Sequence, residues 1–451
     1  MSMKSVIIIV VSLVFLIITL SICAEEYELK YKAVDPYLRS LYVSGQSPQA
    51  MAEPDEELSA KPELKSRIPV YISLILGNGE DKYTLILDES NGTGTGYDVL
   101  YVDSNNNEDL TDDSVIPLRI PNNNEMKQFG PIEVMIKYDD ILEPYYFYLE
   151  YQRMNTPVLH ENSKFLENIY LRLIPGGYFT CTAKIGKSEY KIGAVDFNGN
   201  GVYNDTFNVL SDIKYPDGRL YAIGDQVLFT MNVNREDMPI GFYPYSKYID
   251  LDGKWYSVNV SSDGRKMEIN KADLDLGTIR VPYQLDSLQL VSENGVMTIK
   301  LRLVSEKGVT IINGGLDPKG KTTHEYEVPV GTYSLFAYSM RTKKWTTKSG
   351  EEWYCNASGT ESVQRFQVNK GEVIDFKIGL PFVVNISCLQ LSDQQKSIEA
   401  GDTVLLSLTF SGQAGEIFTN IQKGISPLPR PTFKAVDENG KVVAEGSFEY
   451  G

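Results

Sequence analysis

Two short stretches of the chain are unusually dense in side-chain oxygens. They read VDSNNNEDLTDD, from Val102 to Asp113, and VDFNGNGVYNDT, from Val195 to Thr206. Aligned without a gap, both follow the pattern V-D-x-N-x-N-x-x-x-[TN]-D. Calcium takes six to eight hard oxygen ligands, which a short loop supplies from alternating positions. The shared spacing therefore predicts two Ca²⁺ sites.

The predicted ligands are counted from the first aspartate of each loop. Positions 1, 3, 5 and 9 offer side-chain oxygens, position 7 a backbone carbonyl and position 10 a further carboxylate. The first set is Asp103, Asn105, Asn107, Asp109, Thr111 and Asp112, and the second set is Asp196, Asn198, Asn200, Val202, Asn204 and Asp205. Asp113 or the more distant Asp225 could add another carboxylate.

The second loop resembles the calcium loops of the EF-hand and dockerin type through its first nine positions. It has Gly201 at position six, where the chain must turn sharply, whereas the first loop has Glu108 there. Both loops depart from the pattern at position twelve, where Ser114 and Phe207 replace the bidentate glutamate. The resemblance implies bound calcium. Because each loop follows a strand-like run, the ion would be a structural staple and not the switch of a helix pair.

The alternative interpretation is that Asn, Asp and Gly only form turns in these stretches. Two other places show that pattern, VDENGK with Lys441 and DLDGK with Lys254 at the corresponding position. A lysine would lie against the ion there, and neither predicted loop contains one. The shared spacing and the absence of a lysine from both loops favour calcium binding over turn formation alone.

The elements that must hold the loops are predicted to be strands. Short runs such as IPVYISLILG, YDVLYVD and IEVMIKYDD are rich in β-branched residues and tyrosine, and Gly, Asn and Asp bound them. No window has the period of a long amphipathic helix. We expect an all-β protein of several antiparallel sheets or β-sandwiches with little helix.

Polar interruptions divide the chain into six predicted segments. They are a signal peptide or N-terminal anchor (1–23), a linker (24–67), a β domain with each calcium loop (68–160 and 161–275), a β-sandwich domain (276–383) and an immunoglobulin-like module (384–451). The last pattern stops directly after a strand, so we expect this module to be truncated.

The N-terminus predicts export. One lysine precedes an apolar run from Val6 to Ile22, followed by acids. The run nearly reaches the length that spans a bilayer, so an uncleaved anchor stays open. LSIC resembles a bacterial lipobox with Cys23 as the lipidated residue, although Ile22 departs from it. The remaining cysteines are Cys181, Cys355 and Cys388, and a bridge between the last two stays open.

Other chemistries have little support. The chain has 60 acidic and 43 basic residues, a net charge of −17, which disfavours nucleic acid. His160 and His324 are the only histidines, so zinc sites and Ser-His pairs are disfavoured. The 29 tyrosines could form a sugar-stacking surface.

The leader, the linker and the two loops together resemble exported β-rich bacterial proteins without an assigned activity. We expect a non-catalytic, secreted or envelope-associated protein that calcium stabilises and that has a structural or adhesive role. The membrane would be contacted only through the N-terminal segment, and a cell-surface glycan or protein is the expected partner. The alternative is a carbohydrate-binding or glycan-processing extracellular protein.

Overall fold

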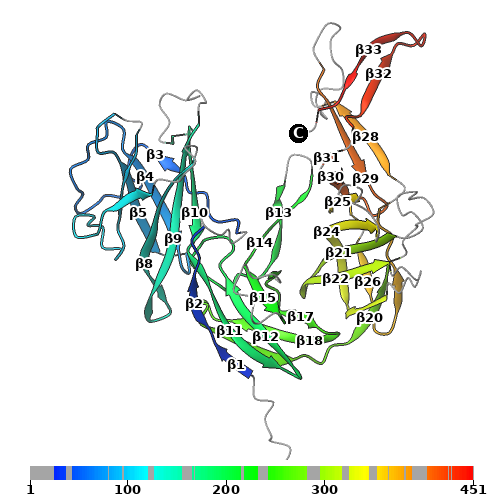
Figure 1. Cartoon of the computed structure of the whole chain (residues 1–451), viewed down its shortest axis with the longest axis horizontal. Coiled ribbons are helices and arrows are strands. Elements are labelled where there is room, and N and C mark those ends of the chain that lie inside the picture. The colour runs from blue at the N-terminus through cyan, green and yellow to red at the C-terminus, as the bar shows by residue number, and fades with distance from the viewer. Residues whose placement is uncertain are drawn as a thin grey trace, which may run out of the picture. The chain divides into compact units, whose positions relative to one another are not determined.

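The computed structural model describes residues 25–36, 43–79, 81–93, 96–119, 126–154, 165–166, 168–214, 218–231, 242–281, 295–316, 325–344, 353–363, 365–379, 382–388, 404–424, 426–427 and 429–449. Within these ranges every regular element is a strand, which confirms the all-β prediction (Figure 1). The described residues therefore contain no helix that could cross a bilayer. The predicted signal peptide or anchor, residues 1–23, lies outside them, as do both histidines.

The chain forms two compact units that differ from the predicted segments. Unit 1 comprises Met1–Asp205, Asp225–Tyr243 and Tyr256–Lys271, and unit 2 comprises the rest. The predicted domains 68–160 and 161–275 thus share one unit for most of their length. The segments 276–383 and 384–451 share the other. The predicted segments are joined in this way because strands far apart in the sequence pair with each other. Polar interruptions in the sequence do not reveal such pairing.

Unit 1 contains an eight-stranded antiparallel sheet that is nearly closed into a barrel. Its order is β10-β9-β8-β7-β6-β5-β4-β3. The edges approach where Gln46 and Leu173 exchange backbone hydrogen bonds of 3.2 and 2.7 Å. The strands are β3 (Ala50–Met51), β4 (Val70–Leu76), β5 (Asp81–Asp88), β6 (Val99–Val102), β7 (Ile116–Arg119), β8 (Lys127–Tyr138), β9 (Ile141–Arg153) and β10 (Ile169–Pro175).

Alternating apolar residues explain why this sheet has a filled interior. In β8, buried and more exposed residues alternate from Ile132 to Tyr138, as a strand with one core face requires. Tyr83, Phe129 and Phe147 are among its large, fully buried side chains. Burial of these rings, together with the Ile, Leu and Val side chains around them, favours the folded sheet through the hydrophobic effect.

A second sheet of unit 1 has the order β16-β15-β12-β11-β2. Its strands are β2 (Lys30–Ala33), β11 (Gly177–Ile185), β12 (Ser188–Val195), β15 (Gln226–Thr230) and β16 (Phe242–Pro244). In addition, β1 (Glu25–Glu28) pairs with β19 (Lys266–Lys271), which pairs with β18 (Lys254–Val260). The predicted linker 24–67 therefore contributes three strands, β1, β2 and β3, each at the edge of a sheet.

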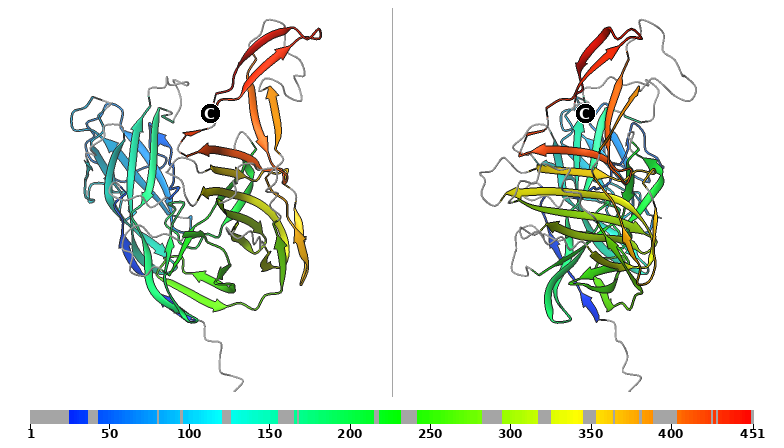
Figure 2. Two further views of the ribbon diagram at one scale, coloured as in Figure 1. Left: turned by 45° about the vertical axis from the view of Figure 1, so that its right-hand side comes forward. Right: turned by 90° about the vertical axis from the view of Figure 1, so that its right-hand side faces the viewer.

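Unit 2 is a β-sandwich. A three-stranded sheet, β23-β20-β27, packs its apolar face on a nine-stranded sheet whose main order is β22-β21-β24-β25-β30-β29-β28. Ile279, Leu301, Leu335 and Val368 lie in the shared core. Figure 2 shows the strands of the larger sheet side by side, in yellow-green to orange.

The bounds of the unit 2 strands are as follows: β13 (Asn208–Lys214), β14 (Leu220–Ile223), β17 (Tyr248–Leu251), β20 (Leu276–Arg280), β21 (Gly295–Ser305), β22 (Gly308–Leu316), β23 (Glu325–Pro329), β24 (Gly331–Lys344), β25 (Trp353–Ser358), β26 (Phe366–Val368), β27 (Val373–Asp375), β28 (Val383–Cys388), β29 (Leu406–Ser411), β30 (Ile417–Lys423), β31 (Ser426–Pro427), β32 (Thr432–Val436) and β33 (Val442–Ser447).

The stretch 384–451, predicted as an immunoglobulin-like module, is divided in the structure. Its strands β28, β29 and β30 continue the nine-stranded sheet, while β32 and β33 form a separate hairpin. None of Cys181, Cys355 and Cys388 is disulfide-bonded, so the bridge left open by the sequence is absent.

Candidate calcium loops

The first loop, Asp103–Asp112, leaves the end of β6. The buried Asp103 carboxylate accepts hydrogen bonds from the backbone N–H groups of Asn107 (3.0 Å) and Glu108 (2.8 Å). The Asn105 Oδ1 accepts the Asn107 N–H at 3.1 Å, and the Asn107 Oδ1 accepts the Asp109 N–H at 2.8 Å. The loop thus winds around its own side-chain oxygens.

The second loop, Asp196–Asp205, leaves the end of β12 and repeats this arrangement. The fully buried Asp196 carboxylate accepts the N–H groups of Asn200 (3.3 Å) and Gly201 (2.8 Å). The Asn198 Oδ1 accepts the Asn200 N–H at 3.1 Å, and the Asn200 Oδ1 accepts the Val202 N–H at 2.9 Å. Every one of these bonds joins the same loop positions as in the first loop.

Backbone conformation follows the same correspondence. Positions four and six are left-handed in both loops: Asn106 (φ 57°) and Glu108 (φ 66°) in the first, Gly199 (φ 77°) and Gly201 (φ 81°) in the second. Glycine adopts this conformation without strain, whereas glutamate pays a steric cost. The first loop therefore has the same path as the second at a higher conformational cost.

The aspartate at position ten closes each loop. The Asp112 Oδ2 accepts the Nδ2 groups of Asn107 (2.9 Å) and Asn105 (3.5 Å). The Asp205 Oδ2 likewise accepts those of Asn200 (2.7 Å) and Asn198 (2.8 Å). The residues at positions 1, 3, 5 and 10 are therefore brought together in both loops.

The residues predicted at positions seven and nine behave differently. Asp109 directs its carboxylate to the N–H (2.8 Å) and hydroxyl (2.5 Å) of Thr111, and these bonds lower the Asp109 pKa. Asn204 is exposed at the surface. The Val202 side chain is buried in the core, and its backbone N–H donates to the Asn200 Oδ1 at 2.9 Å. At position nine the two loops therefore differ, because the Thr111 hydroxyl is bonded to Asp109 whereas the Asn204 side chain is exposed.

Two further carboxylates lie beside the loops. The buried Asp225 accepts the N–H groups of Phe197 (3.0 Å) and Asp205 (2.8 Å), so it fastens both ends of the second loop through backbone contacts. Asp113 accepts the Ser104 hydroxyl through Oδ1, while its buried Oδ2 has no hydrogen-bond partner. The sequence suggested either residue as an additional carboxylate ligand. It gave no means of choosing between them.

Burial sets the electrostatics of the second loop. It raises the pKa of Asp196, against the effect of its hydrogen bonds, and it raises the pKa of Asp225, to which the Asp196 charge also contributes. Two desolvated carboxylates are costly without a positive counter-charge. A cation bound in the loop would offset that cost.

The second loop also connects the two larger sheets of unit 1. The Asn200 carbonyl accepts the Gly77 N–H (2.8 Å) at the β4–β5 turn, and Tyr145 of β9 donates its hydroxyl to Asp196 Oδ2 (2.7 Å). Tyr138, at the end of β8, donates its hydroxyl to the Gly201 carbonyl. Sequence analysis missed both tyrosines, because only the paired sheets bring them to the loop.

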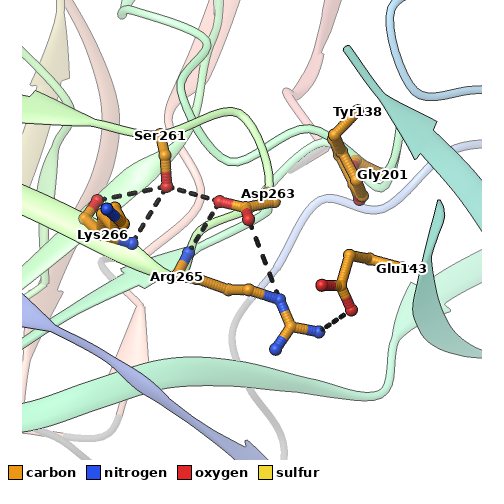
Figure 3. A network of polar contacts seen from close by, with 7 residues as sticks. All are labelled: Tyr138, Glu143, Gly201, Ser261, Asp263, Arg265 and Lys266. Carbon is orange, nitrogen blue, oxygen red and sulfur yellow. Dashed lines mark hydrogen bonds and ion pairs between the residues drawn. The ribbon is translucent and has the colours of Figure 1, made fainter. Parts of the chain in front are cut away.

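A polar network lies next to this junction (Figure 3). In the β18–β19 turn, Asp263 accepts bonds from the Ser261 hydroxyl and the Arg265 N–H. The Arg265 guanidinium forms a 2.5 Å ion pair with Glu143 of β9. The Ser262 carbonyl accepts the Tyr203 N–H at 3.0 Å, so the turn packs on the second loop. These contacts fix the loop from a third side.

No protein-family model, curated protein or solved structure matches this chain. Within the described ranges, no three or more His, Cys, Asp or Glu side chains form a group that could hold a metal ion by themselves. Amide and backbone oxygens would therefore have to supply most ligands, as they do in many calcium sites.

Proposed function

We propose that this chain is a non-catalytic, extracytoplasmic β-rich protein whose two loops bind Ca²⁺, and that it has a structural or adhesive role. The observation that carries the proposal is the repeated loop geometry. Two separate stretches assemble Asp, Asn, Asn and Asp at positions 1, 3, 5 and 10 with the same hydrogen bonds. Each Asn carbonyl uses one lone pair in these bonds and retains another for an ion.

The location of the loops supports a structural role for the ion. The second loop joins two sheets of unit 1, and its buried carboxylates gain most from a counter-charge. The net charge of −17 also favours cations near the surface. Export is proposed from the N-terminal sequence alone.

The tyrosines do not support the alternative of a tyrosine-lined sugar platform. In the stretch EPYYFYLEYQ, the side chains of Tyr145, Tyr148 and Tyr151 are buried, as are those of Tyr178 and Tyr203 elsewhere in unit 1. They fill the interior, and their rings are not available for stacking on a sugar.

The proposal is tested by thermal unfolding in EDTA and in calcium. A site with a dissociation constant of roughly 1 mM, typical of extracellular modules, gains about 1.4 kcal/mol in 10 mM Ca²⁺, because only the folded form binds the ion. We expect Tm to rise by about 3–5 °C per site. An identical Tm in EDTA and in Ca²⁺ contradicts the proposal.

The matched variants are Asp196→Asn and Asp437→Asn. Asp437 accepts the N–H groups of Asn439 and Lys441, both at 2.9 Å, in a similar turn whose lysine excludes a cation. Asp196→Asn should remove about half of the calcium-dependent rise in Tm. Asp437→Asn should leave that rise unchanged. If both variants changed the calcium-dependent rise in Tm equally, the two aspartates would act only in forming turns.

A further inference from the structure

The outer face of the nine-stranded sheet in unit 2 carries a basic and polar surface. In β21, Ile299, Leu301 and Leu303 point into the sandwich core. Side chains alternate across a strand, so Lys300 and Arg302 lie on the opposite face. This outer face is the one that the three-stranded sheet does not cover.

Strand register extends this surface over four strands. Lys300 is paired with Ser339 of β24, Ser339 with Asn356 of β25, and Asn356 with Asn420 of β30. With neighbouring strands about 4.8 Å apart, the row spans roughly 14 Å.

The neighbouring row repeats this character. Arg341 of β24 is paired with Tyr354 of β25, which is paired with Gln422 of β30. We call Lys300, Arg302, Arg341, Asn356, Asn420 and Gln422 the basic face.

The charge of the basic face is opposite to that of the chain. The two rows contain Lys300 and Arg341 but no acidic residue, in a protein with 60 acids and 43 bases. Arg302 is partly buried, and no described carboxylate forms an ion pair with it. Burial lowers the pKa of Arg302. A partly desolvated cation without a counter-ion costs stability, so a ligand function would explain its presence.

The position of the face restricts what can bind. Strands β21, β24 and β25 each have a neighbour on both sides, so their backbone N–H and C=O groups are already paired (Figure 1). A peptide cannot add here as an extra strand, which requires a free edge. Recognition must use side chains, and cations on β21 and β24 beside amides on β25 and β30 suit a ligand that carries both carboxylate and hydroxyl groups.

We propose that the basic face binds an acidic polysaccharide, a sugar chain that carries carboxylate groups. The inference names a ligand class for the adhesive role proposed above and rests on that role only. It does not depend on calcium, because both loops belong to unit 1.

Affinity electrophoresis in EDTA tests this with three polymers: polygalacturonate, neutral dextran and polyglutamate. We expect polygalacturonate to retard the protein and the other two to leave its mobility unchanged. No retardation by polygalacturonate overturns the proposal. Equal retardation by dextran would show that the charge of the ligand plays no part in binding. Equal retardation by polyglutamate would show that the basic face binds acidic peptides instead. Because calcium is absent, failure here is distinct from failure of the calcium proposal.

Charge-removing variants locate the binding. Arg302→Gln and the more exposed Arg341→Gln should each weaken polygalacturonate binding about tenfold, the effect of losing one charge-assisted hydrogen bond. Lys370→Gln removes the same charge from an exposed ion pair with Asp275 and should not change binding. Tm should not fall in Arg302→Gln, because an unpaired cation is removed. A lower Tm with unchanged binding would assign Arg302 a purely structural role.

Discussion

At the scale of single residues, the most consequential groups are buried carboxylates, and each has a different set of partners. Asp196 and Asp225 belong to the second loop, where a cation could offset their burial. Glu416 lies in unit 2, fully buried, and accepts hydrogen bonds from the Gly379 N–H (2.7 Å), the Ala414 N–H (2.9 Å) and the Tyr338 hydroxyl (3.1 Å). Hydrogen-bond donors alone stabilise the charge of this buried carboxylate.

Burial raises the pKa of Glu416 above the ordinary glutamate value of 4.5, against the effect of these donors. The folded state therefore keeps the proton at pH values where the unfolded state has released it. The stability contribution is fully present below pH 4.5 and falls as pH rises through the raised folded pKa. Above that pKa the contribution is constant.

Glu416→Gln should remove this pH dependence of unit 2. It should also cost about 1–3 kcal/mol at neutral pH, because one amide oxygen cannot accept the N–H groups on both sides. Urea unfolding at a series of pH values measures both effects, with the exposed Glu445→Gln as control. An unchanged slope in Glu416→Gln would show that another group titrates.

At the scale of elements, the two loops share one path but differ in the residue at position six. Glu108 takes φ 66° in the first loop, where Gly201 takes φ 81° in the second. A left-handed conformation costs a non-glycine residue about 1–2 kcal/mol, part of which the greater chain entropy of glycine offsets.

Glu108→Gly should therefore stabilise unit 1 by about 0.5–1 kcal/mol in EDTA. Its side chain is exposed, so little packing is lost. The control is Glu57→Gly, at an exposed position without a left-handed backbone, which should be neutral or slightly destabilising. Chemical denaturation of the two variants and the unmodified chain makes the comparison. A destabilised Glu108→Gly variant would mean that the glutamate has contacts worth more than its strain.

At the scale of the whole molecule, the chain consists of two units with separate cores. Clusters around Tyr178 and Ile86 belong to unit 1, and the cluster around Leu301 belongs to unit 2. Both calcium loops lie in unit 1, and the basic face lies in unit 2. The two proposed binding activities can therefore be separated experimentally in the full chain.

Calorimetry of the full chain should show two thermal transitions. Calcium is expected to raise only the transition of unit 1, because a ligand stabilises the cooperative unit that binds it. Asp196→Asn identifies that transition, and Glu416→Gln identifies the other. Equal calcium shifts of both transitions would contradict independent units.

Local sequence patterns were sufficient for the strands and for the composition of the loops. Alternating apolar residues and Gly, Asn and Asp turns predicted the all-β class, because a strand exposes opposite faces at successive residues. The spacing predicted six ligands in each loop, and the residues at positions 1, 3, 5 and 10 do meet, because hydrogen bonds within ten residues of chain create that geometry.

Only the tertiary structure decided what surrounds those loops and how the strands are distributed. Tyr138, Tyr145 and Asp225 reach the second loop from other strands, and β1 to β3 join sheets whose other members lie far along the chain. Likewise, the basic face exists only because register aligns Lys300 with Asn356 and Asn420. Pairing between distant strands depends on the free energy of the whole core, which no local pattern contains.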